Sequence, residues 1–352
     1  MTIVYFLILL SLIIVIHEAG HLAAAKKFGV YCYEFSFGMG PAIFQKKGKE
    51  TVYSIRAIPI GGYVSMAGEQ DGDEMYPDVK VAEDRRLINK PWWQKVIIML
   101  AGVFMNFMLA WIIFSMIFLS NGVFYEPAKA VVSQVVEGSP AEKAGFMSGD
   151  VIRKIIKEDG SSAEVDTYLD MQTFSNGYSG LETYVIERNG ETMELQVQPA
   201  YDEESGMYLI GIVGSEGETK TVNLVNCWYY GLAEMGTIFR LLVITIASIF
   251  HGSGFSQFSG PVGIYQATET YAAMGFGSFM ALVAQLSMNV GIFNLLPLPV
   301  LDGGQVVITL AETVVGKELN TKVKTVLMAV CWVLLIGFML FVTWNDIAKL
   351  FS

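Results

Sequence analysis

The chain has 352 residues, of which 53% are hydrophobic and only 16% are charged. This composition is too apolar for an ordinary soluble enzyme and indicates several bilayer spans, while the net charge of −11 comes from residues 121–222, with 18 acidic and 7 basic residues. The cysteines Cys32, Cys227 and Cys331 are odd in number and far apart, which excludes a disulfide framework and a cysteine-type zinc site.

Four apolar runs are each long enough to cross about 30 Å of hydrocarbon. Eleven of the 23 basic residues lie between Lys26 and Lys95, and three more lie near Gly316, so the loops after the first and third runs are expected in the cytoplasm. Both termini are then expected outside. Lys26 and Lys27 follow the first run, the reverse of a signal peptide, so we expect a retained span. The runs cover residues 3–25, 96–120, 279–300 and 325–348, approximately.

The first run contains three ionisable residues, His17, Glu18 and His21. Such groups are costly at membrane depth, so we expect them to face protein or water and to have partners. In the pattern HEAGH, the two imidazoles project from one helical face and can share a zinc ion, while Glu18 can act as general base. A chance pair on a surface helix is the alternative, but it does not explain the apolar surroundings.

Residues 35–69, between the first two spans, are predicted to form short β segments because glycines and prolines interrupt them repeatedly. We expect hairpins packed at the cytoplasmic face of the membrane, where non-helical backbone is tolerated only against protein or water.

The acidic segment alternates apolar and polar positions between Gly-rich turns, which predicts a small, mostly β domain outside the cytoplasm. Its stretch GSPAEKAGFMSGDVI, residues 138–152, resembles the binding-loop and helix signature of PDZ domains. A generic β-barrel-like spacer is the alternative. Residues 228–250 are predicted to form a helix in or against the interface, because a fifth span would reverse the orientation of the last two.

A catalytic zinc normally has three protein ligands and one open position, so HEAGH needs a further ligand. The candidates are His251 and Asp302. His21 lies five residues, about 7 to 8 Å of helix, before Lys26, which favours Asp302 at the cytoplasmic end of the third run. Pro297 and Pro299 should break the helix there, and Gly303 and Gly304 should allow unusual backbone angles.

HEAGH, NLLPLPVLDG at 294–303, the PDZ-like insert and FSGPVG at 258–263 together resemble the site-2 protease family. The resemblance covers nearly the whole chain. Within the family, the chain most resembles the bacterial regulator-of-sigma-E-protease branch, in a version with one PDZ domain. It implies an intramembrane zinc metalloprotease with His17, His21 and Asp302 as ligands and Glu18 as acid/base. It also implies that the residues holding the substrate backbone are Asn294 and the β element Gly61, Gly62, Tyr63 and Val64. Some relatives have two PDZ domains, so this compact chain leaves substrate selection open.

The fold class we expect is a polytopic α-helical membrane protein with about four transmembrane helices, a membrane-associated β element and an inserted extracytoplasmic PDZ-like α+β domain. The expected substrates are single-pass membrane proteins already shortened outside, such as anti-sigma factors and remnant signal peptides. The expected location is a bacterial cell membrane, with the lipid bilayer and no nucleic acid as partner. We expect four parts along the chain: the first two transmembrane helices with the β element, the PDZ-like domain, the interfacial helix with its loop, and the last two transmembrane helices. These parts cover residues 1–120, 121–215, 216–275 and 276–352, respectively.

Two other functions would require different features of the sequence. A membrane scaffold or receptor, binding peptides through its PDZ domain, would need a fourth protein ligand to close a structural zinc site. A zinc transporter would be expected to carry ionisable groups through the full membrane depth, whereas here they cluster at one level.

Overall fold

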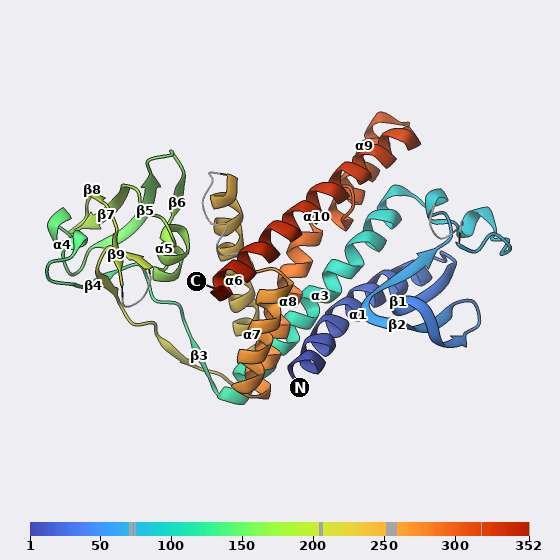
Figure 1. Ribbon diagram of the computed structural model, residues 1–352, viewed down its shortest axis with the longest axis horizontal. Coiled ribbons are helices and arrows are strands. Elements are labelled where there is room, and N and C mark those ends of the chain that lie inside the picture. The colour runs from blue at the N-terminus through green and yellow to red at the C-terminus, as the bar shows by residue number, and fades with distance from the viewer. Residues whose placement is uncertain (70–72, 74, 204–206, 251–258, 318, 352) are drawn as a thin grey trace. The chain divides into compact units, whose positions relative to one another are not determined.

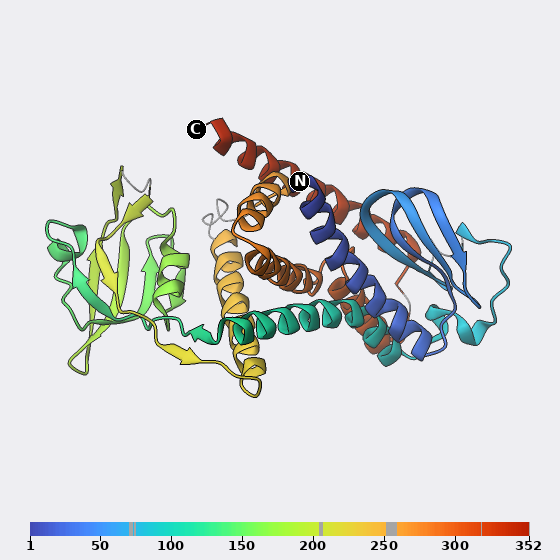
Figure 2. The same ribbon diagram turned by 90° about the horizontal axis from the view of Figure 1, so that it is seen from below.

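The computed structural model groups the chain into two compact units (Figures 1 and 2). Unit 1 comprises residues 1–117 and 260–352, and unit 2 comprises residues 118–259. The structure describes residues 1–69, 73, 75–203, 207–250, 259–317 and 319–351. His251 therefore lies outside the described residues.

Unit 1 is built from long apolar helices. The predicted apolar runs fall on α1, α3, α8 and α10, and part of α6 in unit 2, Cys227–Ala247, is also long and apolar enough to cross a membrane. The chain therefore has the helices of a multi-pass membrane protein. The helices of unit 1 are α1 (Thr2–Lys27), α3 (Trp92–Asn121, ending in unit 2), α7 (Pro261–Ala273), α8 (Phe276–Asn294), α9 (Asp302–Val315) and α10 (Thr321–Phe351). Two short 3-10 turns, Glu83–Arg85 and Leu87–Asn89, precede α3.

Strands β1 (Cys32–Lys47) and β2 (Val52–Met66) form the predicted hairpin and lie along α1 (Figure 2). Each strand bends, so residues 34–37 pair with 62–65 on one side and with 52–55 on the other. The bend in β1 requires Gly38, which has a φ of +83° and whose Cβ would overlap the Ile58 carbonyl. The two strands therefore make a sheet of four segments, with residues 62–65 at one edge.

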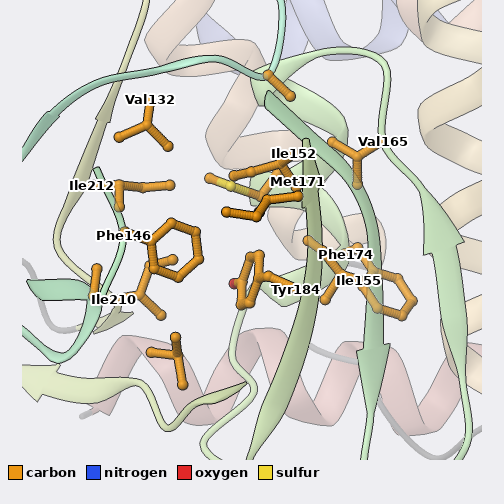
Figure 3. Packing of buried hydrophobic residues seen from close by; sticks show 14 residues of the cluster. Val132, Phe146, Ile152, Ile155, Val165, Met171, Phe174, Tyr184, Ile210 and Ile212 are labelled. Atoms are coloured by element: carbon orange, nitrogen blue, oxygen red, sulfur yellow. The ribbon is translucent and has the colours of Figure 1, made fainter. Parts of the chain in front are cut away.

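Unit 2 contains a four-stranded antiparallel sheet in the order β6-β5-β7-β8. Tyr184 and Ile186 alternate along β7, and a register shift after Ile152 in β5 puts Ile152 and Ile155 in the same hydrophobic core. Figure 3 shows Ile152, Ile155 and Tyr184 in this core. The sheet strands are β5 (Val151–Lys157), β6 (Ser162–Glu164), β7 (Glu182–Arg188) and β8 (Glu191–Val197). Three strand pairs complete the unit: β3 (Val123–Tyr125) with β12 (Thr219–Thr221), β4 (Val132–Val135) with β11 (Ile212–Gly214), and β9 (Ala200–Asp202) with β10 (Met207–Leu209).

The helices of unit 2 are α4 (Pro140–Ala144), α5 (Tyr168–Ser175) and α6 (Cys227–Phe250). In the stretch 138–152, the Ser139 hydroxyl caps α4, and the Asp150 carboxylate accepts hydrogen bonds from Arg188 at 2.6 and 2.7 Å. This stretch therefore joins α4 to the sheet by local caps and a buried ion pair.

Candidate metal centre

Three predicted site residues lie together in unit 1. His17 and His21 are buried one helical turn apart on α1, and their Nε2 atoms are 3.1 Å apart. Asp302, the first residue of α9, places its Oδ2 atom 3.1 Å from His17 Nε2 and 3.6 Å from His21 Nε2. Three potential ligand atoms from two helices thus converge on one point.

The turn between α8 and α9 delivers Asp302 to this point. The apolar run of the sequence continues to residue 300, but the helix stops at Asn294, ahead of the two prolines. Inside the turn, the amide of Leu298 donates to the Leu296 carbonyl and the amide of Leu301 donates to the Leu298 carbonyl, both at 2.8 Å.

Gly303 and Gly304 were expected to permit unusual backbone angles, but this freedom is not what the structure uses. Both residues are helical, and neither has a positive φ. A Cβ on Gly303 would instead overlap the Leu295 carbonyl, and one on Gly304 would overlap the Leu298 carbonyl. Glycine is needed here because the preceding turn folds directly against the start of α9.

The residues fit a zinc ion. Zinc–ligand bonds of about 2.0–2.1 Å in a tetrahedron place the ligand atoms about 3.3 Å apart, close to the separations found here. Apart from the two imidazoles, the buried Oδ2 of Asp302 has no hydrogen-bond donor among the described residues. Two imidazoles and one carboxylate are a donor set typical of catalytic zinc sites, which keep a fourth position open. In the part of the chain that the structure describes, these three residues form the cluster that could hold a metal.

Residues of α3 contact both histidines, and α3 lies near α1 in Figure 1. A Cβ on Gly102 would overlap the imidazoles of both His17 and His21, so glycine leaves the space that the two rings occupy. The Nδ1–H group of His21 donates to the Ile98 carbonyl at 2.8 Å, and the fully buried amide of Asn106 lies 3.3 Å from His17 Nδ1.

These α3 residues were absent from the sequence prediction. Asn106 gave one available signal, because a lone amide inside the long apolar run of α3 needs a polar partner. Gly102 and Ile98 gave none, since a glycine and an isoleucine are ordinary in such a helix.

The predicted β element lies beside Glu18. A Cβ built on Gly62 would be 3.7 Å from Glu18 Cγ, and the Val64 backbone lies within hydrogen-bonding reach of the Glu18 carboxylate. Tyr63 points elsewhere, and its hydroxyl donates to the Glu34 carboxylate at 3.0 Å. Gly61 turns the strand with a φ of +87°. The edge segment thus presents backbone, rather than the Tyr63 side chain, next to Glu18.

Asn294, the remaining predicted residue, is the last residue of α8 and is half-buried. It begins the same turn that ends at Asp302, so the two side chains are held by one compact segment.

Comparisons with known proteins identify the family. The model of Peptidase family M50 matches residues 5–338. A Fusobacterium nucleatum protein whose name assigns it to the zinc metalloproteases is 33% identical over 356 residues and covers 100% of both chains. The zinc metalloprotease RasP of Shouchella clausii is 30% identical over 433 residues and also covers 100% of both chains. The regulator of sigma-W protease RasP of Bacillus subtilis is 28% identical and covers 99% of both.

The match extends over the elements that carry the His17, His21 and Asp302 cluster, and the relatives are similar over their whole length. The chain therefore belongs to peptidase family M50, the site-2 protease family, and is a multi-pass zinc metalloprotease.

Proposed function

We propose that the protein hydrolyses a peptide bond in or near the transmembrane segment of single-pass membrane proteins. One observation carries this proposal: the ligand atoms of His17, His21 and Asp302 converge beside Glu18 on a helix long enough to span a bilayer. Among the described residues the cluster has three potential protein ligands, and a structural zinc site would need four.

His17, His21 and Asp302 would hold the zinc ion. When bound, zinc supplies Lewis acidity toward the scissile carbonyl and toward water. Glu18 takes a proton from the attacking water and donates it to the amide nitrogen of the leaving group, so the carboxylate is regenerated with each turnover. Its position one residue after a ligand keeps this carboxylate at the site without using it as a ligand.

The substrate is proposed to bind as an extended strand. A helical substrate has its carbonyls hydrogen-bonded within the helix, so its peptide bonds must be freed before cleavage. The segment 62–65 pairs with a strand on one side only among the described residues, and Gly62 on this segment lies beside Glu18. An unwound substrate that pairs with this edge would bring its backbone to the general base. Asn294 would hold the substrate backbone near the turn that carries Asp302.

Unit 2 is proposed to be a single PDZ-like domain outside the cytoplasm that admits substrates already shortened there. Its antiparallel sheet, the capped helix α4 and the helix α5 support this assignment. The Tyr168 hydroxyl of α5 donates to the Ile212 carbonyl of β11 at 3.0 Å, and a Cβ on Gly214 would overlap the Tyr168 ring. The space between α5 and β11 is filled by this ring, which favours selection by size over binding of a peptide terminus.

The proposed location is a bacterial cell membrane, with four spans, α6 at the interface, and both termini outside. The basic residues after the first and third runs and the acidity of unit 2 support this orientation. The proposed substrates are membrane-bound regulators such as anti-sigma factors, and remnant signal peptides. The name of the Bacillus subtilis relative, a regulator of sigma-W, is consistent with the first class.

Replacing Glu18 with Gln tests the proposal. We expect cleavage of a model single-pass substrate to fall by at least about 10²-fold, because the general base is lost, while zinc content is unchanged. Glu312→Gln is the matched control, since the Glu312 carboxylate of α9 is paired with Lys324 at 2.7 Å and should not affect cleavage. Wild-type cleavage by the Glu18→Gln enzyme would contradict the proposed role.

A further inference from the structure

Asn106 contacts the metal centre without belonging to its ligand set. Its side chain is fully buried in α3, 3.3 Å from His17 Nδ1, and its Oδ1 atom receives no hydrogen bond from the described residues. Its backbone carbonyl accepts a hydrogen bond from the Ser287 hydroxyl of α8 at 3.0 Å. A buried amide with one atom unpartnered is costly, so the site should give that atom a partner in at least one of its states.

The two histidines need the same proton arrangement to bind an ion. A neutral imidazole carries one N–H, and a ring that binds through Nε2 must keep that proton on Nδ1. The Ile98 carbonyl accepts from Nδ1 of His21, which fixes this form for His21. His17 has the Asn106 amide in the corresponding position.

We propose that Asn106 is a positioning residue that holds His17 in the ion-binding form, an inference that rests on the proposed zinc site. A half-turn of the amide about its Cβ–Cγ bond brings Oδ1 to His17 Nδ1. Oδ1 then accepts the Nδ1–H proton, the buried orphan atom gains its partner, and the lone pair of Nε2 faces Asp302 and His21. Outer partners of this kind orient metal-binding histidines and raise their basicity.

The opposite amide orientation fits the ion-free site. With Nδ2 donating to Nδ1, the ring carries its proton on Nε2, which lies 3.1 Å from Asp302 Oδ2. An amide can serve both forms because it has a donor and an acceptor, whereas a carbonyl or a carboxylate serves only one. Asn106 therefore links the gain of an ion to a change of its own orientation.

The backbone of α3 sets the reach of the amide. Gly102 lies four residues before Asn106 on the same face of the helix, and its missing side chain lets α3 approach both imidazoles. The short Asn106 side chain can reach His17 only because of this close approach.

The test measures zinc affinity by chelator competition and compares variants with the wild type, each as the full-length protein in detergent. Asn106→Leu removes the acceptor with little change in volume, and we expect affinity to fall by about 10–100-fold. Asn106→Asp keeps an acceptor and is expected to stay within about 3-fold of the wild type or to bind more tightly. Ser287→Ala is the matched control, because it removes a buried hydrogen bond of Asn106 that does not involve His17.

A second readout separates positioning from packing. Cobalt bound in place of zinc should change its visible absorption in Asn106→Leu but keep the wild-type spectrum in Asn106→Asp and Ser287→Ala. If Asn106→Leu does not fold, Asn106→Ala takes its place. Wild-type affinity in a folded variant without the acceptor, or equal losses in Asn106→Asp and Asn106→Leu, would overturn the inference. Failure of the wild-type protein to bind zinc would instead overturn the proposed site itself.

Discussion

Two carboxylates of unit 1, Glu34 and Asp302, lie in regions of opposite character. Glu34 of β1 is fully buried, and both of its oxygens accept from the Arg56 guanidinium at 2.8 Å, with further hydrogen bonds from the Tyr63 and Tyr76 hydroxyls. Asp302 of α9 instead turns Oδ2 toward the ring nitrogens of two histidines, at 3.1 Å from His17 Nε2 and 3.6 Å from His21 Nε2.

The difference shows how a structural acid can be told from a functional one. The Arg56 guanidinium and the tyrosine hydroxyls stabilise the Glu34 carboxylate, so these interactions help to hold the sheet together. The Asp302 region instead turns one carboxylate oxygen and two ring nitrogens toward one point, an arrangement that a cation would complete. Burial alone therefore does not mark the site; the balance of donors and acceptors does.

The largest expected effect comes from removing one acid from each region. Asp302→Asn should lower zinc affinity by more than the roughly 10–100-fold typical of a residue that only supports a ligand, because a ligand itself is lost. Glu34→Gln should leave zinc affinity unchanged, since its partners are on the sheet. Metal analysis and chelator competition on both purified variants measure this contrast. Equal zinc loss in both variants would mean that the two regions are not separable in this way.

Removing a donor from the structural region should act on stability instead. Arg56→Met leaves the Glu34 charge buried with only hydroxyl partners, which should cost about 3 kcal/mol, or on the order of 10²-fold faster hydrogen exchange in β1 and β2. The control is Arg153→Met, whose exposed pair with Glu187 in unit 2 should matter little. Protection of β1 and β2 that is unchanged in Arg56→Met would mean that the ion pair does not hold the sheet.

The parts of these regions that could be predicted from sequence are local. The spacing of His17 and His21 fixes their common face by helix geometry alone, and the four apolar runs mark helices by length. Asp302 could be selected over His251 because charged loops set its expected depth. The division into four parts, the roles of the site residues and the span count stay predictions.

The parts that could not be predicted depend on long-range contacts. The Glu34 cluster joins side chains 22, 29 and 42 residues away, and no periodicity encodes such partners. The bending of β1 and β2 into four segments depends on register, which tertiary packing decides. Asn106 meets His17 across 89 residues, so its polarity could be noticed in the sequence but its partner could not.

Lowering the pH should weaken the Glu34 region by a smaller amount than Arg56→Met does. Burial alone would raise the Glu34 pKa, but hydrogen bonds from Ser54, Tyr76, Arg56 and Tyr63 outweigh it and hold the pKa below its ordinary value of 4.5. The unfolded chain therefore takes up this proton at higher pH than the folded chain. The stabilisation is complete above about 4.5 and is lost as pH falls through the folded pKa.

Protection factors from hydrogen exchange in β1 and β2 should therefore decrease below a pH of about 4.5. The effect should be smaller than that of Arg56→Met, because a protonated Glu34 keeps its tyrosine partners. In Glu34→Gln this part of the pH dependence should disappear. Persistence of the full dependence in that variant would assign it to other groups.

The smallest expected effect tests whether burial or the separation of the two charged groups sets the strength of an ion pair. Arg240 of α6 lies 3.0 Å from Asp166, almost as close as Arg56 lies to Glu34, but the Asp166 side chain is 77% exposed. Water already stabilises such a carboxylate, so Asp166→Asn should cost only about 0.2–1 kcal/mol, or about 5-fold or less in hydrogen exchange of α5 and α6. A loss as large as that of Arg56→Met would show that separation, not burial, sets the strength of these pairs, and the distinction between Glu34 and Asp302 would then need another basis.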